Sequence, residues 1–253
     1  MLFLLRKIRR KLMEKNKFTT YLLYAFGEIV LVVIGILLAL QINVWNGERI
    51  LQKQETMYLS RLIAENEKDL VTISNSLDEV KLSMSTIDNF CNALNDTSVG
   101  DSAVIQAAQA YLQHGSVVPQ FNSSSSTFED LSSTGNMRVI QDENLRNDII
   151  QHYNDIVIMQ ERMRVNSEWA IAIDGPFYFE FEFMRLEPNT SHLFPERSAN
   201  QLVKEMRSEK LKYINNAASG YWVDMDTQFL LEKLREKTTS LIDQMKREIE
   251  SQN

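Results

Sequence analysis

The side chains that could support catalysis or bind a metal are few in this 253-residue sequence. It contains one cysteine, Cys91, and three histidines, His114, His152 and His192. A cysteine beside a histidine would suit nucleophilic catalysis, and clustered histidines would suit a metal ion. The histidines lie far apart along the chain, however, and a single cysteine excludes a disulfide framework or a zinc ribbon. Since Cys91 and His152 fall on apolar helical stripes, we expect structural roles for both, with Cys91 as a small buried hydrophobic residue and His152 as a hydrogen-bonded core histidine.

A pair of acidic residues, Glu180 and Glu182, has the spacing of two side chains on one face of a strand. Paired carboxylates can act as general acid and base, but no group converges on this pair to tune its pKa values. The sequence also lacks a Walker loop, a G-x-S-x-G elbow, an H-E-x-x-H motif and an EF-hand loop. We therefore expect no enzymatic activity, no cofactor and no metal site.

The most unusual ionisable residue is Glu28, the one charged residue in the apolar run 21–45. On a helix it shares one face with small and apolar residues. This predicted interface consists of Glu28, Val32, Gly35, Ala39, Ile42 and Asn46. Small residues allow helices to approach closely, and an acid in a membrane is costly unless it faces protein or water. We favour helix–helix association; an ion relay and a carboxylate at headgroup level are the alternatives.

The run 21–45 has the length and composition of a membrane-spanning helix. Its 25 residues would span about 37 Å, against about 30 Å for a bilayer core. Tyr21, Tyr24 and Trp45 stand at its ends, as in an aromatic belt. The run is too long for the apolar core of a signal peptide and has no A-x-A site after it. We therefore predict an uncleaved transmembrane helix.

The flanking charges predict the orientation of this helix. Residues 1–20 hold seven Lys and Arg residues against one Glu, whereas the basic and acidic residues are balanced in the twenty positions after Trp45. By the positive-inside rule, the N-terminus is cytoplasmic and residues 46–253 lie across a bacterial inner membrane, in the periplasm. The arm 1–20 has the pattern of an amphipathic helix on the inner leaflet. The whole chain has a net charge of −7, so the residues after the basic arm are strongly acidic, which argues against a nucleic-acid partner.

Two motifs carry a resemblance to a known family. The first is Arg6-Lys7-Ile8-Arg9, then Asn16-Lys17-Phe18, then YLLYAFGEIVLVVIGILLALQINVWN; the second is Ser132-Ser133-Thr134-Gly135-Asn136-Met137, then Ile140, then Glu143-Asn144-Leu145-Arg146. Together they resemble an uncharacterised family of small single-pass membrane proteins from Bacteroidota, catalogued as a domain of unknown function. Val44 and Gly47 depart from that pattern. The resemblance implies a membrane anchor and no particular chemistry.

Beyond the span, the sequence predicts long helices. Residues 48–99 contain no Gly or Pro, and apolar positions recur there in steps of four and three. This helical seam consists of Leu59, Ile63, Asn66, Leu70, Ile73, Leu77, Val80, Met84, Ile87, Cys91 and Leu94. A seam of this kind packs against a second copy of itself or against helices of its own chain. Its polar member, Asn66, would set the register or meet water at the edge.

Two further stripes complete the predicted architecture. One consists of Leu145, Ile149, His152, Ile156, Met159 and Met163, with Asp142 as N-cap; the other consists of Val223, Leu230, Leu234, Leu241 and Met245. Shorter pieces are a helix near 103–112, a flexible serine loop at 123–126 and a helix starting near Ser198. Asp174-Gly175-Pro176 would end the second helix, and the aromatic and acidic alternation through Phe179, Phe181 and Phe183 would form an extended segment.

The fold class is therefore all-α, with a transmembrane helix that continues into an antiparallel periplasmic bundle. Its parts are the arm 1–20, the span 21–45 and the bundle 46–253. The expected function is non-enzymatic: self-association or assembly with an envelope complex, with the lipid bilayer, further copies of the chain and other envelope proteins as partners. The alternative is a sensing or ligand-binding bundle that signals through a partner.

Overall fold

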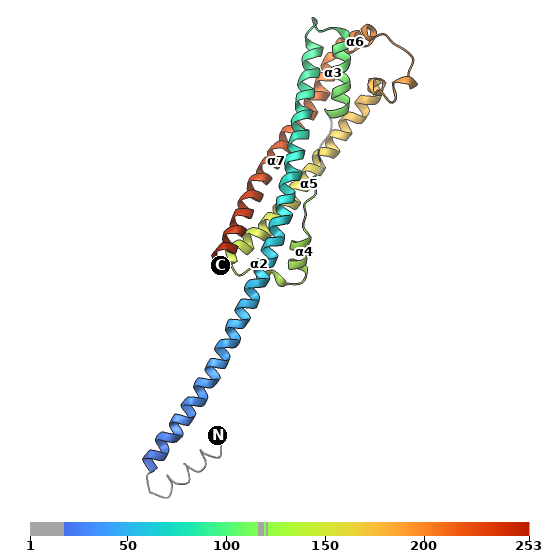
Figure 1. Cartoon of the computed structure of the whole chain (residues 1–253). Coiled ribbons are helices and arrows are strands. Elements are labelled where there is room, and N and C mark those ends of the chain that lie inside the picture. Colours follow the sequence, from blue (N-terminus) through green and yellow to red (C-terminus); the bar gives the residue numbers. More distant parts are fainter. Residues whose placement is uncertain (1–17, 116–118, 120, 253) are drawn as a thin grey trace. The chain divides into compact units, whose positions relative to one another are not determined.

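The computed structural model describes residues 18–115, 119 and 121–252, and every regular element in these ranges is helical (Figure 1). The all-α prediction is thus confirmed. The amphipathic helix predicted for the arm falls almost entirely on residues 1–17, which lie outside the described ranges. The chain divides into two compact units, one ending at Glu55 and one beginning at Thr56. Each unit is described by itself below.

The N-terminal unit holds the first part of helix α2 (Phe18–Asn95). The apolar side chains from Leu22 to Trp45 are exposed, and the most apolar window of the helix has a mean hydropathy of 2.5 with none of it buried. By length and composition it is the one helix among the described residues that is able to cross a membrane. Exposed aliphatic side chains of this density are unfavourable in water, so the unit is suited to lipid.

The second unit is a bundle of three long helices, formed by α2 from Thr56 onward, α5 (Glu143–Glu180) and α7 (Lys210–Ser251). Helix α7 runs antiparallel to α2: Thr56 Oγ1 donates to Gln252 Oε1 at 3.1 Å, and Ser83 Oγ donates to Asp224 Oδ2 at 2.6 Å. It also runs antiparallel to α5, with Asn216 bonded to Asp174 and Lys237 to Asp155, so α2 and α5 run in the same direction. The short helices α3 (Asp101–His114) and α6 (Ala199–Ser208) lie at one end of this bundle, and α4 (Ser126–Ser133) lies at the other (Figure 1).

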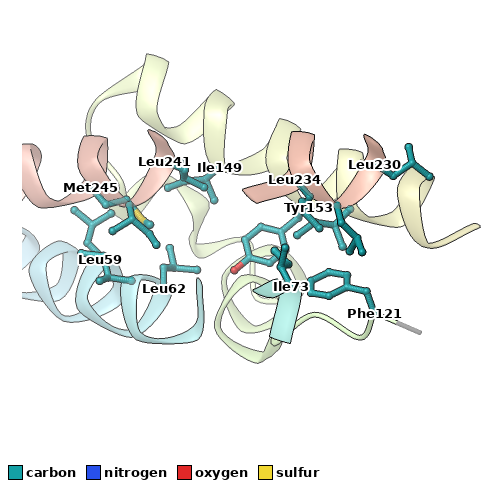
Figure 2. Packing of buried hydrophobic residues seen from close by; sticks show 14 of the residues in the cluster. Leu59, Leu62, Ile73, Phe121, Ile149, Tyr153, Leu230, Leu234, Leu241 and Met245 are labelled. Atoms are coloured by element: carbon teal, nitrogen blue, oxygen red, sulfur yellow. The ribbon is translucent and has the colours of Figure 1, made fainter. Parts of the chain in front are cut away.

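A core of mainly aliphatic side chains joins the three long helices near α4. We call it the aliphatic cluster; its buried members are Leu59, Leu62, Ile63, Ile73, Leu77, Val80, Phe121, Leu131, Ile140, Leu145, Ile149, Tyr153, Ile156, Met163, Leu230, Leu231, Leu234, Leu241, Ile242 and Met245. Figure 2 shows Leu59 and Leu62 of α2 with Leu241 and Met245 of α7. Removing these surfaces from water, at about 25 cal/mol per Å², is what drives the helices together.

A second core, rich in aromatic rings, lies near α3 and α6. This aromatic cluster consists of Ile87, Phe90, Ala93, Leu94, Val104, Ala108, Tyr111, Phe177, Phe183, Leu186, Val203, Met206, Tyr213 and Ala217. Phe183, in the 3₁₀ helix η2 (Phe183–Leu186), lies within 6.1 Å of five other rings, measured between ring centroids. Phe90 stacks on Tyr111 at 5.0 Å. Such pairs add about 0.5–1.5 kcal/mol each beyond their buried area.

The serine run 123–126 is held by two acidic residues of α2. Asp69 accepts from Ser123 Oγ at 2.5 Å and from the Ser124 backbone N–H at 2.9 Å. One turn earlier on α2, Glu65 accepts from the hydroxyl and N–H of Thr127 at the start of α4. The prediction of a loop holds for 123–125, but these bonds fix it in place. Helix α4 was missed because its polar sequence carries no long apolar stripe.

The prediction that α5 ends at Pro176, and that an extended segment follows, was wrong. Helix α5 continues to Glu180, with Pro176 inside it. Phe177 and Phe181 are one helical turn apart, and both contact Tyr213, at 5.2 and 5.1 Å between ring centroids. Phe179, which the strand pattern placed on the same side as Phe181, is 85% exposed. The packing of two rings thus outweighs the hydrogen bond that proline removes.

The boundary residues of the helices follow the predicted signals more closely. Asp142 accepts from the Leu145 N–H at 2.8 Å, as an N-cap of α5. Ser198 and Gln201 form a capping box at the start of α6.

Polar side chains connect three helices at the end of the bundle near α3. Tyr111 Oη donates to Asn216 Oδ1 and Asn216 Nδ2 donates to Asp174 Oδ1, both at 2.8 Å. The remaining elements are the 3₁₀ helices η1 (Asn136–Val139) and η3 (Ser191–Leu193).

Candidate interaction surface

The helical seam of α2 lies inside its own bundle. Eight of its members are buried, whereas Leu70, Met84 and Cys91 are half-buried. Asn66 is one of the eight buried members, and its Nδ2 donates to Leu62 O at 2.8 Å and to Tyr153 Oη at 3.2 Å. Of the two packing arrangements that the heptad pattern allowed, the structure therefore has the one within a single chain. The seam is not available to a second copy.

The predicted interface in the apolar run has a different environment. Glu28, Val32, Gly35, Ala39, Ile42 and Asn46 are all exposed on α2. A Cβ atom added at Gly35 would meet no atom within 4 Å, so close packing against another helix is sterically possible there. The structure brings these residues together only as neighbours on one helix, and their role as an interface stays a prediction.

A second exposed apolar surface lies on the bundle itself, along the outer side of α5 and α7. On α5 it contains Ile158, Val165 and Trp169, and on α7 it contains Trp222, Met225 and Phe229. We call these six residues the outer strip. Their spacing of three, four and seven places them on one face of each helix.

The two halves of the outer strip meet along its length. The rings of Trp169 and Trp222 lie edge to face, with centroids 5.5 Å apart. Arg162, two turns before Trp169 on α5, is bound to Asp226 of α7, with Nε donating to Oδ2 at 3.1 Å. Each of the six side chains is between 42% and 65% exposed. Because α5 and α7 run antiparallel, the register set by these two contacts predicts four successive rungs: Trp169 with Trp222, then Val165 with Met225, then the ion pair, then Ile158 with Phe229.

The outer strip was not among the surfaces predicted from the sequence, since the predicted stripes all face inward. A second stripe was present in the sequence, at positions 158, 165 and 169 and at positions 222, 225 and 229. Each long helix of a small bundle has one inward apolar stripe, so a second stripe on the opposite side is a signal for a further contact.

Among the buried ionisable side chains of the bundle, His152 and Asp224 have shifted pKa values. His152 is 4% exposed, and neither of its ring nitrogens has a hydrogen-bond partner among the described residues. Burial lowers the pKa of His152 to about 4, against the opposing effect of Asp69 and Asp155. The expected core position is thus observed, but the hydrogen bond expected with it is not. Burial also raises the pKa of Asp224 to about 7, although the bond from Ser83 opposes the shift.

A cluster of charges surrounds Glu182 at the end of α5. Glu182 has a left-handed φ of 47°, the one such non-glycine residue in the described ranges. Its carboxylate accepts from Arg185 Nη2 at 2.6 Å and lies 3.5 Å from Arg197, and the bond from Arg185 lowers its pKa. The expectation that no group converges on Glu180 and Glu182 was therefore wrong for Glu182. Arg185 and Arg197 follow it in the sequence, and the fold brings both close to its carboxylate.

The same arginines line an open groove of about 820 Å³ between α3 and the segment 187–198. Arg185 is 8% exposed, and its guanidinium also donates to Pro195 O and lies 4.9 Å from the Phe194 ring centroid. Arg197 is also paired with Glu205, at 2.8 Å. Both cations are therefore neutralised by protein groups, and the cluster holds the segment 187–198 against the bundle.

The single thiol has no features of a nucleophile. Burial, together with the nearby Asp88, raises the pKa of Cys91. A raised pKa lowers the thiolate fraction at neutral pH. Within the described ranges, no group of three or more His, Cys, Asp or Glu residues is placed to hold a metal ion.

Comparison with known proteins adds one match. A family model described as a family of unknown function (DUF6090) matches residues 28–168, more than half of the chain. The chain belongs to this family. No curated protein and no solved structure matches it. The DUF6090 match contains Glu28, the seam and the α5 residues Ile158 and Val165 of the outer strip, whereas Trp169 and the α7 residues lie outside it.

The mid-chain motif 132–146 lies within the DUF6090 match and has a structural explanation. Gly135 adopts φ 71° between α4 and the 3₁₀ helix η1 (Asn136–Val139), a conformation that other residues rarely adopt. Ile140 is fully buried, and its carbonyl accepts from Arg146 Nη1 at 2.9 Å. Leu145 is buried at the start of α5. The motif therefore closes the turn between α4 and α5 over the aliphatic cluster.

Proposed function

We propose that this protein is a non-enzymatic, single-pass protein of a bacterial inner membrane whose periplasmic bundle associates with other protein chains. In this arrangement the N-terminus is cytoplasmic, residues 21–45 span the bilayer and residues 46–253 form the periplasmic part. The bundle joins copies of itself or a larger envelope complex. This function belongs to the class of assembly proteins, in which surfaces rather than reactive groups carry the activity.

The observation that carries this proposal is the outer strip. Large exposed apolar side chains normally occur singly on a soluble surface, whereas here three aromatic and three aliphatic side chains are contiguous on one face. Aromatic residues and arginine are the residue types enriched at the centres of protein interfaces, and here Arg162 lies among the exposed aromatic rings. The candidate span and its basic flank support the membrane anchor and its orientation.

Two measurements test the proposal. Alkaline phosphatase fused after Asn253 should be active, and a cytoplasmic fluorescent reporter at the same position should stay dark; the reverse pattern would contradict the orientation. Chemical crosslinking of the full chain in native membranes should give species heavier than the monomer. If the chain stays monomeric at every crosslinker concentration, it is not an assembly protein.

The groove beside Arg185 supports a second candidate function, ligand sensing. Its volume suits a small molecule, and its Arg and Glu pairs would suit a zwitterion, which can exchange partners with both charges. Free amino acids, added one at a time to the full chain in lipid nanodiscs, would then raise the unfolding temperature. The effect should disappear in Arg197→Ala. If no amino acid shifts the unfolding temperature, this function has no support.

A further inference from the structure

We infer that the partner of the outer strip is a second copy of this chain, docked about a two-fold axis. This inference rests on the proposed function and names its partner. In a two-fold interface the same surface is used by both copies, so the strip must be complementary to itself. Three properties of the strip support such a contact between two copies.

The first property is its size. An aromatic side chain presents about 150–250 Å² when fully exposed, so Trp169, Trp222 and Phe229, each about half exposed, contribute roughly 300 Å² together. With Ile158, Val165 and Met225, the exposed apolar area is on the order of 600 Å². That area is at the upper end of what a monomer exposes in one patch and approaches the roughly 800 Å² per partner of a standard interface.

The second property is its charge. The whole chain has a formal net charge of −7, so two copies repel each other over most of their surface. The strip itself is locally neutral: Arg162 is paired with Asp226, Arg164 is bound by Glu161 and Glu168, and Lys233 lies over the Phe229 ring, so three cations offset three carboxylates. A neutral apolar face in an acidic protein is the surface on which like copies approach at least cost.

The third property is the order of its rungs. A two-fold axis that crosses the strip at the rung of Val165 and Met225, perpendicular to the helices, brings Met225 opposite the same residue of the other copy. The tryptophan pair then provides the large, rigid contact area typical of residues that dominate binding energy. Because both copies are confined to one membrane in the proposed function, their effective concentration is high, and a modest interface suffices.

The rung of Val165 and Met225 allows a charge-exchange experiment. In full-length protein, Met225→Glu places two carboxylates opposite each other in a dimer, and Met225→Lys places two ammonium groups there. Each variant alone should lose self-crosslinking in native membranes by about tenfold or more, since like charges across an interface are strongly unfavourable. Differently tagged Met225→Glu and Met225→Lys chains, produced together, should regain it. Unchanged unfolding temperatures establish that both variants fold.

The matched control is Val71→Glu, since Val71 is 62% exposed on α2, away from the strip. It should crosslink as the wild type does. If Met225→Glu also crosslinks as the wild type does, or if the mixed pair fails to recover, the two-fold contact at the strip is refuted. Crosslinks to a different protein alone would refute the second copy while leaving the proposed assembly function in place. Absence of any crosslink would refute both.

Discussion

The aliphatic and aromatic clusters of the bundle are built from different parts of the sequence. Most aliphatic members stand on three long helices, at the spacing of three and four that a helix imposes. The aromatic cluster draws on α2, α3, η2, α6 and the ends of α5 and α7. Its central ring, Phe183, stands on a 3₁₀ helix of four residues. One cluster is thus a product of helical periodicity, and the other depends on contacts between segments distant in sequence.

This difference has a physical consequence for stability. A long helix that loses one aliphatic contact is still held by contacts one turn away on both sides. The segment around η2 has no such repetition, because Phe183 is the residue through which it contacts five rings. We therefore expect the aliphatic cluster to respond to damage as a whole and the aromatic cluster to open locally.

The largest expected effect is that of Phe183→Ala. Removal of a fully buried Phe costs about 3–5 kcal/mol, from the lost transfer free energy and the cavity that remains. Hydrogen exchange in residues 181–208 should accelerate well before exchange in residues 145–163. Phe179→Ala is the matched control, since Phe179 is exposed four positions away and its loss should change stability by less than about 0.5 kcal/mol. Uniform acceleration throughout the bundle would show that the two clusters unfold as one.

The same contrast explains how much could be predicted from the sequence. The three long stripes, the Asp142 N-cap and the helix after Ser198 follow local rules, and the structure contains them. The course of α5 beyond Pro176 was not predictable, because it is decided by Tyr213, which lies far along the chain. For the same reason, the positions of Arg185 and Arg197 around Glu182 became evident only in the fold. The outer strip differs from these cases, since its spacing was present in the sequence and was overlooked.

Asp224 lies at the junction of the two clusters, where it is bonded to Ser83 of α2. On α2, Ser83 stands between Val80 of the aliphatic cluster and Ile87 of the aromatic cluster. The pKa of Asp224, about 7 when folded against 3.8 for an ordinary Asp, means that folding is favoured while this carboxyl is protonated. Its contribution is present below pH 3.8 and is lost as pH rises to about 7. Asp224→Asn should therefore stabilise the chain at pH 8 by on the order of 3 kcal/mol.

His152 in the aliphatic cluster has the opposite dependence. Its pKa is about 4 when folded and 6.5 when exposed, so the folded chain loses stability as pH falls from 6.5 to 4. The slopes due to Asp224 and His152 oppose each other over this range. In urea titrations from pH 4 to 6.5, stability relative to wild type should rise with pH in Asp224→Asn and fall with pH in His152→Gln. Identical slopes in the two variants would refute the assignment of both groups.

A smaller effect is expected where polar groups attach α4 to the aliphatic cluster. Asp69→Ala removes the acceptor of the Ser123 hydroxyl and the Ser124 N–H, at a cost of about 1–3 kcal/mol. Asp69→Asn retains one acceptor oxygen and should recover part of the loss. Asp78→Ala serves as the control, because its carboxylate is exposed on the same helix beside Lys81 and contributes little. Chemical denaturation measures all three, and an equal loss in Asp69→Ala and Asp78→Ala would contradict the role of Asp69.

The smallest predicted effects come from substituting two glycines, Gly135 beside the aliphatic cluster and Gly175 beside the aromatic cluster. The two substitutions should change the free energy of unfolding in opposite directions. A Cβ atom at Gly135 or at Gly175 would meet nothing within 4 Å apart from its own neighbours in the chain. Gly135 has φ 71°, where a Cβ is unfavourable, and Gly135→Ala should cost about 1 kcal/mol. Gly175 lies inside α5, and Gly175→Ala should add about 0.5–1 kcal/mol, because alanine loses less backbone entropy in a helix. Thermal unfolding followed by circular dichroism should therefore shift down for Gly135→Ala and up for Gly175→Ala. A downward shift for Gly175→Ala would mean that the helix around Pro176 needs the freedom of glycine, and that α5 is held there by the aromatic cluster against its own local preference.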